Sequence, residues 1–168
     1  TTNDGYPLDI MTEEGFGAEF VDNMYDENTG RGMLLFNNYV TSIPAEAFLE
    51  CTNLTWMRLP EGITSIGSEA FYGCTSLKNV NLPNGLENIY DGAFMGCTSL
   101  ETIAFPESLT SISNAVFEDC TSLSTIIVMN PNLITLGGSS VFSGIAEGAV
   151  VYVPSSEAET IYEADANW

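Results

Sequence analysis

The sequence predicts an α/β repeat solenoid, a fold in which short units of 23 residues stack on one another along one axis. The first observation is the constant spacing of the four cysteines, Cys51, Cys74, Cys97 and Cys120. The second is that the residues around them repeat as well, so that 70–77 matches 93–100. The third is that the apolar positions keep one register in every unit. Each unit can therefore bury its apolar side only against its neighbours.

One unit predicts three local elements. Residues 79–83 alternate in polarity and end in proline, which predicts a short strand. Residues 86–89 predict a second extended piece, and residues 91–96 a single helical turn. Stacking then gives a parallel sheet on one face, short helical turns on another, and a column of buried rings from Phe48, Phe71, Phe94, Phe117 and Phe142.

The same register predicts where the array ends. It runs over 32–154, about five and a half units, with small insertions at 129–131 and 137–140. Both ends of such a stack expose core and strand edge, so each needs a cap. Residues 1–31 are the predicted N-terminal capping segment, with a β-hairpin between strands at 16–21 and 32–37. Residues 155–168 are the predicted C-terminal helical cap, which would lay Ile161, Tyr162 and Trp168 over the last unit.

The composition excludes several classes of partner. The chain has 23 acidic and three basic residues, a net charge of -20, which repels nucleic acid and anionic lipid. The same charge favours a monomer. The longest apolar runs are much shorter than the roughly 20 residues that cross a bilayer, so no membrane insertion is predicted.

The residue types also argue against catalysis and metal binding. The chain has no histidine, which removes Ser-His-Asp and Cys-His nucleophile systems and most zinc sites. No acidic run has the spacing of a calcium-binding loop. We therefore predict a protein that is not an enzyme and has no metal or cofactor.

The cysteines are predicted to be buried free thiols. They occupy one repeated position between phenylalanine and leucine, so they stack at about the inter-strand spacing of 4.8 Å. That distance suits a disulfide, but side chains that project in parallel do not reach the required torsion near 90°. Each cysteine then acts as a small apolar residue.

The unit Cys-Thr-Ser-Leu-x-x-Val-x-Leu-Pro-x-x-Leu-x-x-Ile-x-x-x-Ala-Phe closely resembles the BspA-like leucine-rich repeats of bacterial cell-surface proteins, over about 32–168. The resemblance implies a right-handed leucine-rich-repeat array, secretion or display on a bacterial surface, and adhesion to host proteins or other cells. It supplies no catalytic residues. The chain starts at Thr1 without a charged-then-apolar stretch, so we expect a signal or lipoprotein segment to lie outside it.

Outward-facing strand positions give the candidate site. If Val80 points into the core, its neighbours Asn79 and Asn81 point outward. Each of them then belongs to a column of equivalent outward positions that runs across the units. One column holds Trp56, Asn79, Thr102 and Thr125, and the other holds Arg58, Asn81, Ala104 and Ile127. A tryptophan beside an arginine is typical of interface hot spots, and the apolar end of the second column favours a protein partner. The predicted ligand-binding residues are Trp56, Arg58, Lys78, Asn79, Asn81 and Thr102.

Three functions remain open at this stage. The leading one is recognition of a protein, such as a host extracellular-matrix or surface protein. The second is carbohydrate binding, with Trp56 as a stacking platform and the Asn and Thr side chains as partners for hydroxyls. The third is a passive spacer. In a purely structural interpretation Lys78 pairs with Glu101 across the stack, and Trp56 seals the N-terminal hairpin.

Overall fold

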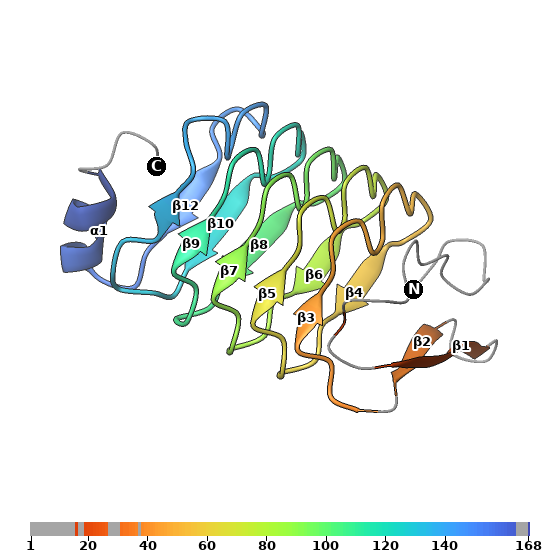
Figure 1. The fold of residues 1–168 in the computed structure, drawn as a ribbon. Helices are drawn as coiled ribbons and strands as arrows, with labels where there is room; N and C mark the ends of the chain where they lie inside the picture. The colour runs from red at the N-terminus through yellow and green to blue at the C-terminus, as the bar shows by residue number, and fades with distance from the viewer. Residues whose placement is uncertain (1–15, 17–18, 27–30, 37, 164–167) are drawn as a thin grey trace.

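The computed structural model describes residues 16, 19–26, 31–36, 38–163 and 168. The chain forms a solenoid of parallel strands whose coils stack along one axis, with a hairpin at one end and a helix at the other (Figure 1). The predicted fold class is confirmed. Successive coils repeat about every 23 residues, as the register of the paired strands shows.

Two sets of short parallel strands run along opposite sides of the solenoid. The broad set comprises β4 (Trp56–Arg58), β6 (Asn79–Asn81), β8 (Thr102–Phe105), β10 (Thr125–Val128) and β12 (Val150–Tyr152). We call its outward side, which points away from the core, the strand face. The narrow sheet has five strands, β3 (Ser42–Ile43), β5 (Ser65–Ile66), β7 (Asn88–Ile89), β9 (Ser111–Ile112) and β11 (Thr135–Leu136).

Tight turns form the third side of each coil. Where the sequence predicts a helical turn at 91–96, successive hydrogen bonds join residues three apart, for example from Met95 N–H to the Gly92 carbonyl at 2.9 Å. The backbone is left-handed at Gly92 and Gly96, with φ of 61° and 73°, and this interrupts a helix. The equivalent positions of other coils hold non-glycine residues in the same conformation, namely Glu46, Glu50, Glu69, Ala115 and Asp119.

The core is built of columns of identical residues. The predicted phenylalanine column is continuous, with stacked rings whose centroids lie 5.0, 5.1, 5.5 and 5.7 Å apart, along Phe48, Phe71, Phe94, Phe117 and Phe142. Beside it the cysteines are free thiols, as predicted. Each buried thiol donates to a phenylalanine carbonyl of the preceding coil, at 3.0 Å for Cys74 and 3.1 Å for Cys120. Burial raises the pKa of both to about 12.

At the N-terminal end, β1 (Phe20–Asp26) and β2 (Arg31–Phe36) form an antiparallel hairpin. The first strand lies later than the predicted 16–21, and residues 27–30 and 37 are outside the described residues. Phe16 instead packs into the core, and its carbonyl accepts a hydrogen bond from Thr41 N–H at 3.1 Å. The domain boundaries given above stay predictions.

The C-terminal end is covered by α1 (Ser156–Glu163) and Trp168. Ser155 caps the helix by accepting a hydrogen bond from Ala158 N–H at 3.2 Å. A bond from its own backbone N–H and then the Ser155 hydroxyl lower the pKa of Glu157 at this helix start. The Ser155 hydroxyl thus satisfies the Ala158 donor in the first helical turn.

Two aromatic residues dock this cap on the last coil. The Tyr162 hydroxyl donates to the Asn132 carbonyl at 2.6 Å, and Trp168 Nε1 donates to the Ile134 carbonyl at 3.2 Å. The expected contact of Ile161 with the last unit is wrong, because this side chain is 42% exposed. Ile161 precedes the inward-facing Tyr162 by one residue and therefore points about 100° away from it around the helix.

The side chains of the last strand, β12, are more exposed to solvent than those of its neighbour β10. Val151 is in register with Ile126 of β10, yet Val151 is 41% exposed and Ile126 only 2%. Val150 and Tyr152 are exposed as well. Within the described residues no further strand pairs with β12, so its outer edge is open.

Candidate binding face

The strand face carries the predicted columns. Ladder register places Trp56 opposite Asn79 and Arg58 opposite Asn81, while Thr102 and Ala104 lie opposite Thr125 and Ile127. Val80 points into the core between the two exposed asparagines, as the alternation predicts. The structure extends the columns by two residues of β12 that the sequence analysis left out, Val150 and Tyr152.

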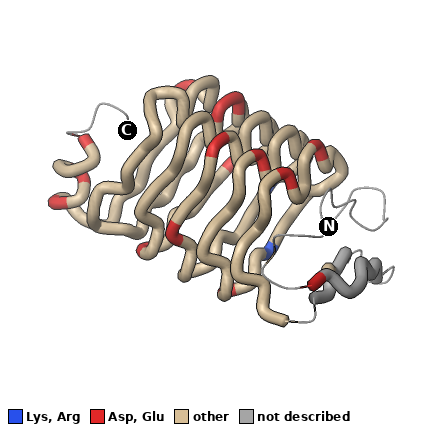
Figure 2. The backbone as a smooth tube through the Cα atoms, in the orientation of Figure 1, with Lys and Arg blue, Asp and Glu red and all other residues tan. Residues whose placement is uncertain are grey.

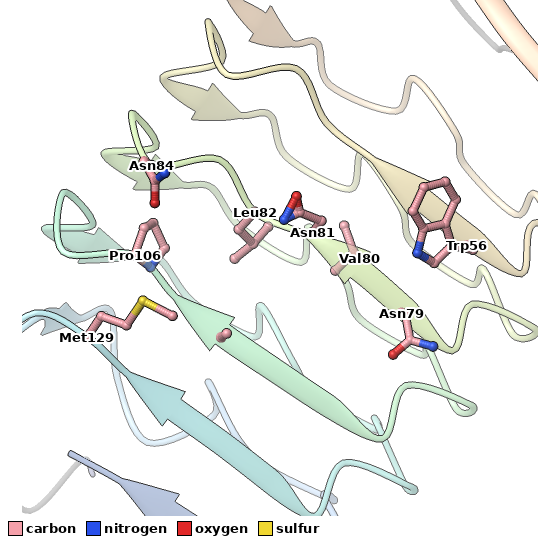
Figure 3. Close-up of a pocket in the computed structure, with 9 residues that line it drawn as sticks. Trp56, Asn79, Val80, Asn81, Leu82, Asn84, Pro106 and Met129 are labelled. Carbon is pink, nitrogen blue, oxygen red and sulfur yellow. The ribbon is translucent and has the colours of Figure 1, made fainter. Parts of the chain in front are cut away.

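Three of the six predicted site residues come together in one groove of about 380 Å³ (Figure 3). We call it the β6–β8 groove. It is lined by Trp56, Asn79, Val80, Asn81, Leu82, Asn84, Ala104, Pro106 and Met129. The other three predicted residues, Arg58, Lys78 and Thr102, are not among its lining residues.

Sequence reasoning missed part of this lining. Asn84 follows Pro83, while Pro106 and Met129 come directly after β8 and β10, outside the alternating strand positions used for the prediction. A signal was present in the sequence: Pro60, Pro83, Pro106 and Met129 stand one period apart at the strand ends, and of these Pro60 and Met129 are exposed.

The β6–β8 groove lies at a break in the broad set of strands. β6 pairs only with β4, and β8 pairs only with β10, so the strands form a two-stranded and a three-stranded sheet. The hydrogen bonds that precede the other strands are present, from Lys78 N–H to the Thr55 carbonyl at 3.0 Å and from Ser124 N–H to Glu101 at 3.1 Å. Within the described residues, the equivalent bond between Glu101 and Lys78 is not formed.

Proline accounts for the missing bond at the far end of the break. In the next coil, Met129 N–H donates to the Phe105 carbonyl at 3.0 Å. Pro106 holds the equivalent position one coil earlier, and proline has no N–H to donate to Leu82. The break also uncovers core, because Val80 and Leu82 are 9% and 8% exposed while their equivalents Ile103 and Phe105 are 1% and 0% exposed.

Acidic residues are absent from the outward positions of the strand face. Those positions hold Trp, Asn, Thr, Thr and Val in one column and Arg, Asn, Ala, Ile and Tyr in the other, in a chain of 23 acidic residues. Figure 2 shows the acidic positions mainly along the turns. Arg58 and Lys78 are exposed, and the expected pair of Lys78 with Glu101 is not among the interactions of the described residues. The two columns thus carry one charged residue, Arg58, and Lys78 and Glu101 stand at equivalent positions just before β6 and β8, so the face is close to neutral.

Two further findings concern sites of other kinds. Among the residues with described positions, no group of three or more His, Cys, Asp or Glu side chains could hold a metal ion. In the same part of the chain, no helix has the length and apolar character needed to span a membrane.

The model of the BspA type leucine rich repeat region matches residues 33–163 of this chain, with six copies. The chain belongs to the BspA-type leucine-rich repeat family. None of the curated proteins matches it.

Solved structures of bacterial leucine-rich repeat proteins are similar to this BspA-type chain. The T. pallidum leucine rich repeat protein is 39% identical with a TM-score of 0.58, over 62% of this chain and 48% of its own. A leucine rich cell surface protein from Faecalibacterium prausnitzii is 26% identical with a TM-score of 0.65, over 77% of this chain and 34% of its own. The chain thus spans about half or less of the length of these relatives.

Proposed function

We propose that this BspA-type chain is a non-catalytic binding module of a bacterial surface or secreted protein, and that it recognises a host or other-cell protein through its strand face. The observation that carries the proposal is the absence of acidic residues from the outward positions of that face, in a chain with a net charge of -20. Burying a carboxylate in an interface is costly unless it is paired. The strand face is the part of this surface that a partner can cover without that cost.

The residues of the face support a protein partner. Trp56 and Arg58 stand on adjacent outward positions of β4, and both residue types are enriched among those that dominate binding energy. The columns continue through Ala104 and Ile127 to Tyr152, which gives an apolar region in place of scattered apolar side chains. Proteins of this repeat class generally act as binding modules.

A neutral carbohydrate is the second candidate, because Trp56 lines the β6–β8 groove together with the carboxamides of Asn79, Asn81 and Asn84. An aromatic face and amide groups can serve the apolar face and the hydroxyls of a sugar. Inert behaviour toward both kinds of ligand would correspond to a passive spacer.

Surface plasmon resonance tests the proposal with a panel of purified extracellular-matrix proteins and glycans. The test variant is Trp56→Ala/Arg58→Ala, and the matched control is Tyr90→Ala/Glu87→Ala, an exposed aromatic and an exposed charge at the narrow sheet. We expect a protein of the panel to bind the wild type and the control, and to bind the test variant at least about 30-fold more weakly. Equal binding by both variants, with intact folding, would remove the strand face from consideration. Loss of binding on deglycosylation of the ligand would favour the carbohydrate.

A further inference from the structure

We infer that the β6–β8 groove receives an extended, uncharged segment of the protein partner, whose main chain is held by the carboxamides of Asn79, Asn81 and Asn84. This inference rests on the proposed function and assigns it a precise place. It concerns the one break in the broad set of strands among the described residues.

The first reason is the form of the surface at the break. Ladders join β4 to β6 and β8 to β10, whereas none joins β6 to β8. The two strands still have Cα pairs within 8 Å, which is closer than the roughly 9.6 Å that a third strand between them would need. A bound segment therefore lies over the break, where the side chains of the groove can reach its main chain.

The second reason is the pattern of side chains in the groove. The carboxamides of Asn79, Asn81 and Asn84 each offer a donor and an acceptor, which matches the peptide group. The remaining lining is largely apolar, with Val80 and Leu82, which are slightly less buried than their equivalents in the next coil, and Ala104, Pro106 and Met129 beside them. An aliphatic or aromatic side chain can be buried there, whereas sugar hydroxyls would lose hydrogen bonds to water.

Size and charge agree with such a segment. A volume of 380 Å³ corresponds to that of about a dozen liquid water molecules, and a bound segment would release part of this water. No Asp, Glu, Lys or Arg lines the groove. A charged side chain entering it would therefore lose its hydration without gaining a partner. This points to a segment without charged residues at its centre.

The test uses a phage library of random peptides, selected on the whole chain. Selected peptides are then measured by fluorescence anisotropy against the wild type, Ala104→Tyr and Thr110→Tyr. Ala104 lines the groove, while Thr110 is an exposed residue directly before β9 of the narrow sheet and does not line the groove. We expect uncharged apolar peptides whose binding is weakened at least about 30-fold by Ala104→Tyr and less than about threefold by Thr110→Tyr.

The backbone part of the inference has its own measurement. Methylation of single peptide nitrogens keeps the side chains and removes one donor at a time, and we expect a loss of about tenfold at one or more central positions. Amide hydrogen exchange should also slow in residues 79–82 and 102–105 when peptide is bound. Unchanged affinity of all N-methylated peptides would overturn the main-chain contacts.

The remaining outcomes separate this inference from the proposed function. If no peptide is selected, or if both tyrosine variants weaken binding equally, the groove is not the site. If a matrix protein still depends on Trp56 and Arg58 in that case, the strand face stands and only the groove is rejected. If methyl glycosides at millimolar concentration displace the peptide, the groove is a sugar site and the inference is wrong. The melting temperature of each variant checks that it is folded.

Discussion

Replacement of Phe94 by alanine should be among the most damaging single changes in this chain. Phe94 is fully buried and stacks between Phe71 at 5.1 Å and Phe117 at 5.5 Å. Buried Phe→Ala changes cost about 3–5 kcal/mol. Two lost ring pairs, at about 0.5–1.5 kcal/mol each beyond their buried area, place this change at the upper end of that range. Since a domain is stable by about 5–15 kcal/mol, a third or more of the total would be lost.

Urea unfolding followed by circular dichroism measures this loss. Phe142→Ala is the matched control, because Phe142 ends the same column and is only half-buried. In a solenoid each coil is stabilised by its two neighbours, so a central defect should cost more than a terminal one. The reasoning is refuted if Phe94→Ala costs less than about 2 kcal/mol, or if Phe142→Ala costs as much.

Backbone strain, buried thiols and the helix cap give three more tests. Ala115 has a φ of 53°, so Ala115→Gly should raise the free energy of unfolding by about 0.5–1 kcal/mol, and a lower urea midpoint would contradict this. The pKa of Cys74 and Cys120 is about 12 in the folded chain against an ordinary 9.0, so unfolding releases their protons above pH 9. Stability should therefore be complete below pH 9 and fall toward pH 12, by up to about 1.4 kcal/mol per pH unit for each thiol, with a shallower slope in Cys74→Ala/Cys120→Ala. Ser155→Ala should cost about 0.5–2 kcal/mol and speed amide exchange in α1, and unchanged exchange would mean that the cap is dispensable.

The constant repeat explains why the fold could be predicted from the sequence. Once Cys74 and Cys97 set the period, every other residue has a known neighbour one coil away, so the stacking of Phe71 on Phe94 follows without any structural information. The same reasoning placed Trp56 beside Asn79 in the site. A constant register converts positions in the sequence directly into contacts.

Features that break the repeat could not be predicted in this way. The missing ladder between β6 and β8 depends on backbone spacing, which Asn81 and Ala104 do not reveal as residue types. The left-handed Glu69 and Ala115 stand where one coil has Gly92, so their residue types did not indicate a left-handed turn in place of a helical one. In α1, the hydrophobic Ile161 gave no sign of its outward direction, because only Tyr162 and Ala158 are held by the last coil.

The open edge of β12 is a place where two copies of the chain could approach, and the net negative charge would then act between them. Strand edges with apolar side chains, such as Val150 and Val151 here, are templates for pairing with another copy. Two copies approaching through these edges each bring a net charge of -20, and their repulsion acts over about 8 Å at physiological salt but only about 3 Å at 1 M. The salt concentration thus sets the distance over which two copies repel each other. Lowering the pH toward the isoelectric point of about 4.1 weakens the repulsion. Most of the carboxylates lie along the turns, so the charge that causes this repulsion is not on the strand face itself.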